Sequence, residues 1–333
     1  MVHLGNGDWM VVDSFIDKQT QNPVALDYLE TLGIDVTHAI KRVVVTHWHN
    51  DHTRGAATIL AKAPAAKSWA SIALQQDNFQ KLLTASQSEP DFGTDEFYKM
   101  LRLLKERAGG RREQIAFSWA KANTIIFNST QCTVASLSPS DASITLAFNE
   151  IGKLVPTLGP RLKAVTQTAN EVAVAVWVHF GANEVILGAD LETGSTEATG
   201  WKAIVASGER PGGQSGFFKV PHHGSDDAHE DGVWTQLLKE NCVAVLTPFN
   251  AGSKPLPTEI DIQRILQRTP HVYLSGPRTP KPTGLSPAVE RLMRQIAPDI
   301  RDLTGNIGHL RFRIDSNGEN PRIELFGRAQ KLS

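Results

Sequence analysis

Short runs of β-branched and apolar residues recur along the chain and predict buried strands. The clearest is 41–46, where three consecutive valines precede Thr46. Two further runs, 171–180 and 184–188, flank a Gly-Ala-Asn turn and predict a hairpin that ends at Asp190. Strands are also expected at 124–127, 132–137, 217–220, 243–246 and 272–274, with hairpins over 3–13 and 309–325.

Helical patterns lie between these strands. They are expected at 26–32, 58–62, 72–83, 97–107, 143–154 and 259–267, with breaks at Pro64, Pro90 and Gly109-Gly110. We interpret 66–117 as a helical insertion. Strands and helices alternate in both halves without a repeated unit, so the pattern predicts an α/β protein with at least two sheets.

Composition and charge exclude several classes of protein. The 333 residues include 34 Lys plus Arg and 35 Asp plus Glu, so the overall charge of −1 gives no general attraction to nucleic acid. The longest nearly unbroken apolar run, 172–180, is far short of the roughly 20 residues of a membrane-spanning helix. Cys132 and Cys242 lack a CxxC spacing and are expected to be core thiols, which favours a cytoplasmic protein.

Four metal-ligand side chains directly follow the strand at 41–46. His47, His49, Asp51 and His52 form an H-x-H-x-D-H motif. Imidazole and carboxylate groups suit zinc or a similar divalent ion, and a loop can wrap them around a small coordination sphere. The alternation lets His47 and His49 face one ion while Asp51 and His52 reach a second.

Three other motifs extend this pattern: Asp13 at the end of an early strand, Gly-Ala-Asp190 after the hairpin, and Pro-His222-His223-Gly-Ser225. Together they resemble the metallo-β-lactamase fold, and most closely the soluble hydrolase domain of the DNA-uptake protein ComEC and its free-standing relatives. The resemblance implies an αββα four-layer sandwich over a single domain, 1–333, that contains the insertion at 66–117. It places the metal site at one edge of the two sheets.

The resemblance also implies roles for individual residues. Asp51 orients the attacking water as well as ligating, and Asp13 braces the histidine loop. Either His222 or His223 completes the second coordination sphere while its neighbour faces substrate; we assign ligation to His222 and catalysis to His223. The implied cofactor is one or two divalent ions, Zn or Mn. The ligand set is His47, His49, Asp51, His52, Asp190 and His222.

The chain departs from the family pattern at Arg54, which stands where the family often has glycine, and at two further places. Many relatives carry another histidine before the later aspartate, but here only His179 lies between His52 and Asp190. If Phe180 pairs with Asn183 across the turn, His179 lies roughly 20 Å from the site and cannot be a ligand. Lys254 stands where many ComEC-like proteins have histidine; it is either a catalytic residue that stabilises a leaving oxyanion or a solvated lysine.

The leading functional hypothesis is a phosphodiesterase, in particular a nuclease, that acts on single-stranded nucleic acid or on a small phosphodiester. Residues 268–333 hold 11 Lys plus Arg and 6 Asp plus Glu, a surplus of 11 − 6 = 5, and further basic residues lie in the insertion. One alternative is hydrolysis of a lactone, thioester or β-lactam; in the resembling family those enzymes generally use the missing histidine. Another is a non-catalytic subunit that contacts a protein partner through the insertion. The insertion's basic residues are Arg102, Lys105, Arg107, Arg111 and Arg112.

Overall fold

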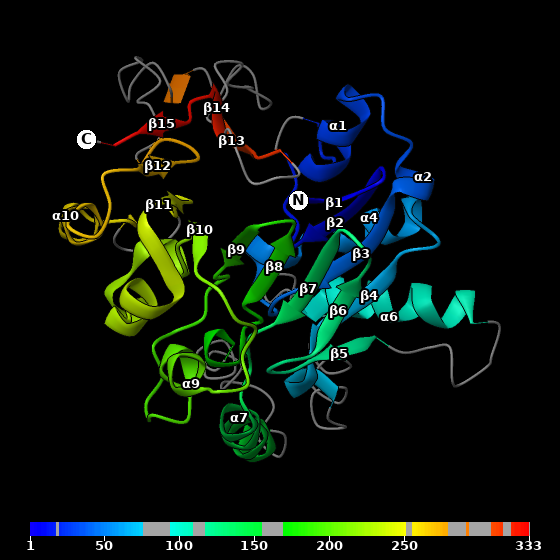
Figure 1. Ribbon diagram of the computed structural model, residues 1–333. Coiled ribbons are helices and arrows are strands. Elements are labelled where there is room, and N and C mark those ends of the chain that lie inside the picture. The colour runs from blue at the N-terminus through cyan, green and yellow to red at the C-terminus, as the bar shows by residue number, and fades with distance from the viewer. Residues whose placement is uncertain are drawn as a thin grey trace.

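Two β-sheets form the centre of the protein, and helices cover their outer faces (Figure 1). The computed structural model describes residues 1–17, 20–75, 94–108, 117–154, 169–250, 255–278, 291–292, 308–315 and 321–332. The helices and helical turns are α1 (Val24–Thr31), α2 (Val36–Ala39), α3 (Asn50–Thr53), α4 (Ala56–Lys62), η1 (Ile72–Gln75), α6 (Thr94–Arg107), α7 (Asp141–Leu154), η4 (Asn170–Val172), α9 (Gly200–Ala206), η5 (His222–Gly224), η6 (Asp226–Ala228), η7 (Val233–Leu237) and α10 (Glu259–Leu266).

The first sheet has the strand order β1-β2-β3-β4-β5. Strands β2 to β5 are parallel, and β1 pairs antiparallel with β2. Strand β3 lies at the centre of this sheet and its three valines are buried. This burial explains the run of β-branched residues from which the strand at 41–46 was predicted. The bounds are β1 (Val2–Gly5), β2 (Asp8–Val12), β3 (Ile40–Val45), β4 (Lys67–Ser71) and β5 (Ser118–Ala120).

The second sheet has the order β15-β12-β11-β10-β9-β8-β7-β6. Strands β9, β10, β11 and β12 are parallel to one another, so their carboxyl ends meet at one edge. The bounds are β6 (Ile125–Asn128), β7 (Cys132–Ser136), β8 (Val176–Phe180), β9 (Asn183–Leu187), β10 (Ser215–Lys219), β11 (Leu238–Leu246), β12 (Val272–Leu274) and β15 (Gln330–Lys331).

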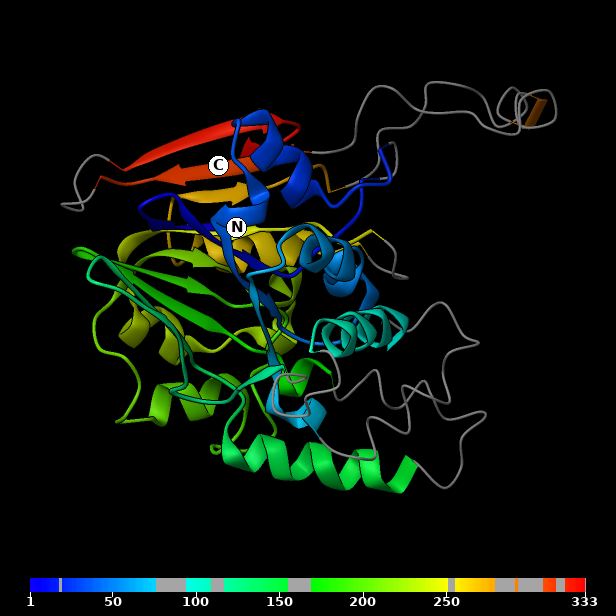
Figure 2. The ribbon, with the colours of Figure 1, turned by 90° about the vertical axis from the view of Figure 1, so that its right-hand side faces the viewer.

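Three apolar clusters separate the layers. One lies between the sheets and joins Met10 and Val44 to Val134 and Val176. A second packs α1, α4 and α6 on the outer face of the first sheet, where Figure 2 shows α4 and α6 side by side. The third packs α9, η7 and α10 on the outer face of the second sheet. The layers therefore run helix, sheet, sheet, helix, and the predicted α/β sandwich is confirmed.

The structure differs from the expected insertion at its first residues. Lys67–Ser71 is strand β4, which pairs with β3 and β5, so part of 66–117 belongs to the first sheet. Its five residues lack the β-branched run that marks β3, which is why the pattern gave no strand there. Helix α6 agrees with the helix expected at 97–107, and most of the helix expected at 72–83 lies outside the described residues.

The predicted hairpin after η4 begins later than expected. Strand β8 starts at Val176, because the preceding residues leave the second sheet and Val174 donates a backbone hydrogen bond to Thr46 of the histidine loop. The register across the turn is the predicted one, with Phe180 opposite Asn183. This crossing ties the two sheets together beside the site.

A two-stranded hairpin, β13 (Gly308–Arg313) and β14 (Arg322–Gly327), lies beside α1 (Figures 1 and 2). Arg311 donates a hydrogen bond of 3.3 Å to the Tyr28 hydroxyl of α1. Cys132 and Cys242 are buried free thiols, as predicted. Within the described residues, no helix is both long and apolar enough to cross a membrane.

Candidate metal centre

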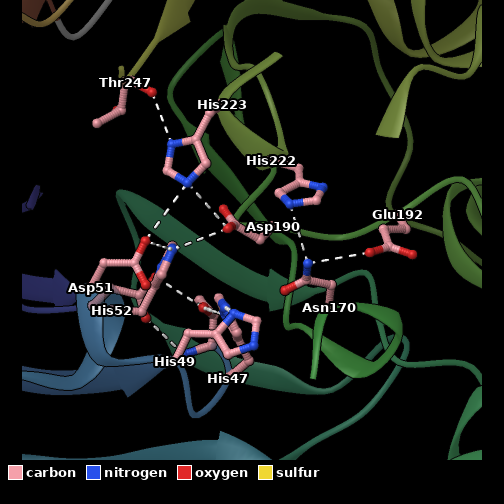
Figure 3. Close-up of polar contacts among 12 residues, drawn as sticks. His47, His49, Asp51, His52, Asn170, Asp190, Glu192, His222, His223 and Thr247 are labelled. Atoms are coloured by element: carbon pink, nitrogen blue, oxygen red, sulfur yellow. Dashed lines mark hydrogen bonds and ion pairs between the residues drawn. The ribbon is translucent and has the colours of Figure 1, made fainter. Parts of the chain in front are cut away.

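The candidate ligands come from loops at the carboxyl ends of strands in both sheets. The histidine loop follows β3 of the first sheet, whereas Asp190 follows β9 and the His222-His223 pair follows β10 of the second. The folded chain therefore brings together side chains that lie up to 176 positions apart (223 − 47) at the edge where the sheets meet (Figure 3). This is the edge at which open parallel sheets place their functional groups.

Four side chains form one candidate ion site: Asp51, His52, Asp190 and His223. His52 Nε2 lies 3.2 Å from Asp190 Oδ2 and 3.7 Å from Asp51 Oδ2, and His223 Nε2 lies 3.4 and 3.7 Å from the same two oxygens. Two ligand atoms on a tetrahedral zinc ion, each about 2.1 Å from it, are about 3.4 Å apart. The spacing therefore suits an ion enclosed by these four groups.

A second group consists of His47, His49 and the same Asp190. His47 Nε2 and His49 Nδ1 are 3.1 Å apart, and the rings of His47 and His52 have centroids separated by 4.2 Å. The two groups are thus adjacent and share one carboxylate. Such an arrangement can hold two ions with Asp190 between them.

Asp13 orients histidines of both groups. Its Oδ2 accepts a hydrogen bond of 2.7 Å from His52 Nδ1 and one of 2.9 Å from the Thr46 hydroxyl, while Oδ1 accepts from the Thr46 backbone N–H at 2.8 Å. Because the Thr46 hydroxyl donates to Asp13, it can accept from His47 Nδ1, 2.9 Å away. Both imidazoles then direct Nε2 at the site, as partners of metal-bound histidines do. The predicted bracing role of Asp13 agrees with these contacts.

His223 is held from the second sheet. Its Nδ1 donates a hydrogen bond of 2.9 Å to the carbonyl oxygen of Thr247, just beyond β11, and its ring stacks on Phe249 with centroids 4.9 Å apart. These contacts aim Nε2 at Asp190 and Asp51. His223 has a φ of +56° and is followed by Gly224 at +86°, so a left-handed turn is what rotates this ring into the site.

Burial and mutual charge set the proton affinity of the group. Burial, together with the neighbouring imidazoles, holds the pKa of His47 well below its ordinary range, so this ring is neutral and can donate a lone pair. Burial alone would raise the pKa of the Asp190 carboxyl, but the imidazoles of His52 and His223 outweigh it and lower that pKa well below its usual value. Asp190 is therefore an anion in the folded protein.

One polar atom at the centre of the site has no hydrogen-bond partner among the described residues. Asp190 is only 2% exposed, and its Oδ1 is buried without a donor. A buried hydrogen-bond acceptor without a partner destabilises the folded protein by on the order of 1–3 kcal/mol, and a charged one by more. A bound cation would compensate this cost. The donor set and this oxygen together fit a divalent ion.

The structure places the two adjacent histidines in different groups. His223, predicted as catalytic, lies with Asp51, His52 and Asp190, whereas His222, predicted as a ligand, points away from them and lies with Glu192 and Asp227, a third group that could hold an ion (Figure 3). His222 Nδ1 donates to Asp227 Oδ1 at 2.8 Å, and Asn170 donates to His222 Nε2 at 3.3 Å. The sequence left the choice open because the backbone turn decides it.

The other predicted residues have separate outcomes. His179 lies on β8, opposite Thr133 of β7 and Glu184 of β9, and belongs to none of the ligand groups, as expected. Trp48, within the histidine motif, is buried and packs in the outer core of the first sheet. Lys254 lies outside the described residues, as do Arg111 and Arg112.

Residue-type reasoning missed the side chains that hold the ligands. Thr46 and Phe249 carry no ligand chemistry, and the carbonyl of Thr247 leaves no trace in the sequence. Thr46 could have been found, because it directly precedes the motif at the end of a strand. Thr247 and Phe249 could not, because their contact with His223 depends on the pairing of β10 with β11.

Comparison with known proteins agrees with this geometry. Residues 1–81 match the family model of the metallo-beta-lactamase superfamily, a segment that includes Asp13 and the whole histidine motif. No curated protein matches the chain.

Two similar solved structures are HARLDQ-motif mutants of a metallo-beta-lactamase from Cronobacter sakazakii. One is 16% identical over 62% of this chain and 57% of its own, and the other is 15% identical over 60% of each; both have a TM-score of 0.29. The chain thus spans less than two thirds of the length of these structures. The family match over residues 1–81 and the clustered His and Asp side chains are together similar to what the metallo-beta-lactamase superfamily presents, and they suggest a metal-dependent hydrolase.

Proposed function

We propose that this protein is a metal-dependent phosphodiesterase that cleaves nucleic acid. The observation that carries the proposal is the pair of adjacent ligand groups that share Asp190. Two-ion sites of this kind recur in phosphatases and nucleases, because one ion can assist the attacking oxygen and the other the leaving oxygen of an in-line displacement. The proposed ligands are His47 and His49 for one ion and Asp51, His52 and His223 for the other, with Asp190 between them.

Each residue has a definite task in this proposal. Divalent ions, when bound, supply Lewis acidity toward water and toward the phosphate oxygens. Asp51 has a side chain 40% exposed, so its carboxylate faces both the buried histidines and solvent and can accept a proton from an incoming water molecule. Asp190 is buried and anionic and holds the two groups together. Zn and Mn both accept such mixed nitrogen and oxygen donors.

The His47 group favours a phosphodiester over a lactone, thioester or β-lactam. Within the described residues it consists of two histidines and the shared carboxylate, and no histidine from outside the H-x-H-x-D-H motif belongs to it. In the resembling family, the hydrolases of carbonyl substrates generally carry that additional histidine. His179, the one histidine between the motifs, lies on β8 away from the group.

The direct test combines metal analysis with hydrolysis of bis(p-nitrophenyl) phosphate. We expect the purified chain to contain up to two equivalents of Zn or Mn and to hydrolyse this diester, and Asp51→Ala to abolish turnover while leaving the unfolding transition in place. His179→Ala is the matched control, because it removes a histidine outside the site. Good turnover of a lactone without turnover of any phosphodiester would reject the proposal.

The proposed polymer substrate has its own signature. A single-stranded DNA or RNA oligonucleotide bound to the Asp51→Ala variant should dissociate as salt rises, since each neutralised phosphate releases counterions. A small diester such as a cyclic nucleotide would show almost no salt dependence. Replacing Arg111 and Arg112 together tests whether the insertion borders the nucleic acid. Contact with a protein partner through 66–117 is a separate prediction.

A further inference from the structure

A polar pocket opens on the second sheet, away from the ligand groups. Its cavity volume is about 420 Å³, and its lining residues are Pro277, Arg278, Arg328, Ala329 and Gln330. None of these residues belongs to the ligand groups of the candidate metal centre. Two of the five carry guanidinium groups, which bind phosphate with several N–H donors in a fixed plane.

Strand register places this pocket at the same edge as the metal site. Strands β10, β11 and β12 are parallel, and Pro277 and Arg278 follow the carboxyl end of β12, as His222 and His223 follow that of β10. Strand β15 is antiparallel to β12, with Gln330 opposite Leu274, so Arg328 and Ala329 lie at that end too. Two strand spacings separate β12 from β10, about 10 Å.

A chain of direct contacts joins the site to the pocket. His223 stacks on Phe249, and the next residue, Asn250, donates a hydrogen bond of 3.4 Å to the carbonyl oxygen of Pro277. Phe249 is partly exposed. Among the described residues, the short segment after β11 therefore contacts both His223 and the pocket residue Pro277.

The pocket wall is built closely from three segments. A Cβ placed on Gly308, at the start of β13, would lie 2.4 Å from the Ala329 nitrogen and 2.5 Å from the Ser275 oxygen, so these backbones are in tight contact. Arg278 lines the pocket and donates to Glu259 Oε2 at 2.6 Å, which restrains its guanidinium. That ion pair engages one of its five N–H donors and leaves others for a ligand.

We infer that this pocket is a subsite for a phosphate of the substrate chain that flanks the scissile phosphodiester. The inference rests on the proposed phosphodiesterase function and specifies its substrate as a polyanion that extends beyond the cleaved bond. A nucleic-acid strand bound at the metal centre would reach the pocket within a few nucleotides, because the strands that precede the two sites, β10 and β12, lie only about 10 Å apart. Arg278 and Arg328 supply the positive charge there, and partly exposed Phe249 lies between.

The test compares two substrates in the full chain loaded with metal. We expect Arg278→Gln and Arg328→Gln each to raise KM for a single-stranded 12-mer about tenfold, the change that loss of one charge-assisted hydrogen bond produces, with kcat unchanged. Hydrolysis of bis(p-nitrophenyl) phosphate, which cannot reach the pocket, should not change. Arg313→Gln is the matched control, because Arg313 is an exposed arginine of the neighbouring hairpin that pairs with Glu324 and does not line the pocket.

Direct binding separates this inference from the function on which it rests. A labelled 12-mer is titrated against Asp51→Ala alone and combined with Arg278→Gln or Arg313→Gln. Arg278-dependent binding, with no wild-type hydrolysis of any diester, would retain the subsite and reject the phosphodiesterase. An Arg278→Gln effect no larger than that of Arg313→Gln, equal losses on both substrates, or no binding of the 12-mer at low salt would overturn the subsite.

Discussion

The two ligand groups that share Asp190 differ in how firmly the protein holds them. The group of Asp51, His52 and His223 has four ligand residues, and its histidines are fixed from opposite sheets by Asp13 and by the Thr247 carbonyl. The group of His47 and His49 has three ligand residues, all but Asp190 from one loop. Each ligand fixed in place reduces the conformational entropy lost when an ion binds.

This difference predicts two ions of unequal affinity. The four-residue group should retain its ion through dialysis, whereas the ion of the His47 group should exchange with the solvent. Because Asp190 serves both, the two ions are coupled through one buried carboxylate.

The largest effect is expected for the shared carboxylate. Asp190→Asn keeps the shape of the side chain but removes the charge that both groups use, so both ions should be lost. Turnover should fall by more than about 100-fold, because even the loss of a residue that only hydrogen-bonds to a metal ligand costs up to about that much. Metal content and hydrolysis of bis(p-nitrophenyl) phosphate measure this. A variant that retains two ions would show that Asp190 does not join the groups.

The next effect separates the groups. His49→Gln should reduce the metal content from two equivalents to one and leave the tightly bound ion, because it removes a ligand from the three-residue group alone. His223→Gln should release the tightly bound ion first. Dialysis against graded chelator, followed by elemental analysis, ranks the two. If both variants lose the same ion, the division into groups is wrong.

Asp13→Asn should have an intermediate effect on both groups. Asp13 contacts His52 directly and reaches His47 through the Thr46 hydroxyl, so the variant should weaken both ions by about 10- to 100-fold. Thr46→Val removes only the hydroxyl path and should weaken the His47 ion alone. Metal titration of the apo proteins distinguishes these cases, and an Asp13 effect on one ion only would contradict the shared support.

The same contrast explains what could be predicted from the sequence. The H-x-H-x-D-H motif and the β-branched run before it are local features of the sequence. The structure places both as expected. The partners Asp13 and Asp190 also lie at strand ends that the pattern marked. The choice of His223 over His222 was not predictable, because it depends on two successive left-handed residues, with φ values of +44° and +56°, in one turn.

Strand β4 was missed for a related reason. Its sequence, Lys-Ser-Trp-Ala-Ser, is short and has no β-branched residue, yet its place between β3 and β5 makes it a sheet strand. Tertiary pairing overrides weak local propensity there. The pocket of Arg278 and Arg328 was also invisible in the sequence, because β15 brings together residues 50 positions apart (328 − 278).

The smallest effect concerns His222, which lies beside the second group but outside it. His222→Gln should leave the metal content unchanged and alter only stability.

Although burial opposes its charged form, the hydrogen bond to Asp227 raises the pKa of His222 above 6.5. A raised folded-state pKa contributes stability that is fully present below the unfolded value of 6.5 and is lost as pH rises through the folded value. In urea unfolding of the apo proteins, wild type should therefore exceed the variant by up to about 1 kcal/mol at pH 6, and the difference should shrink toward pH 9. A lost equivalent of metal would instead return His222 to the ligand set.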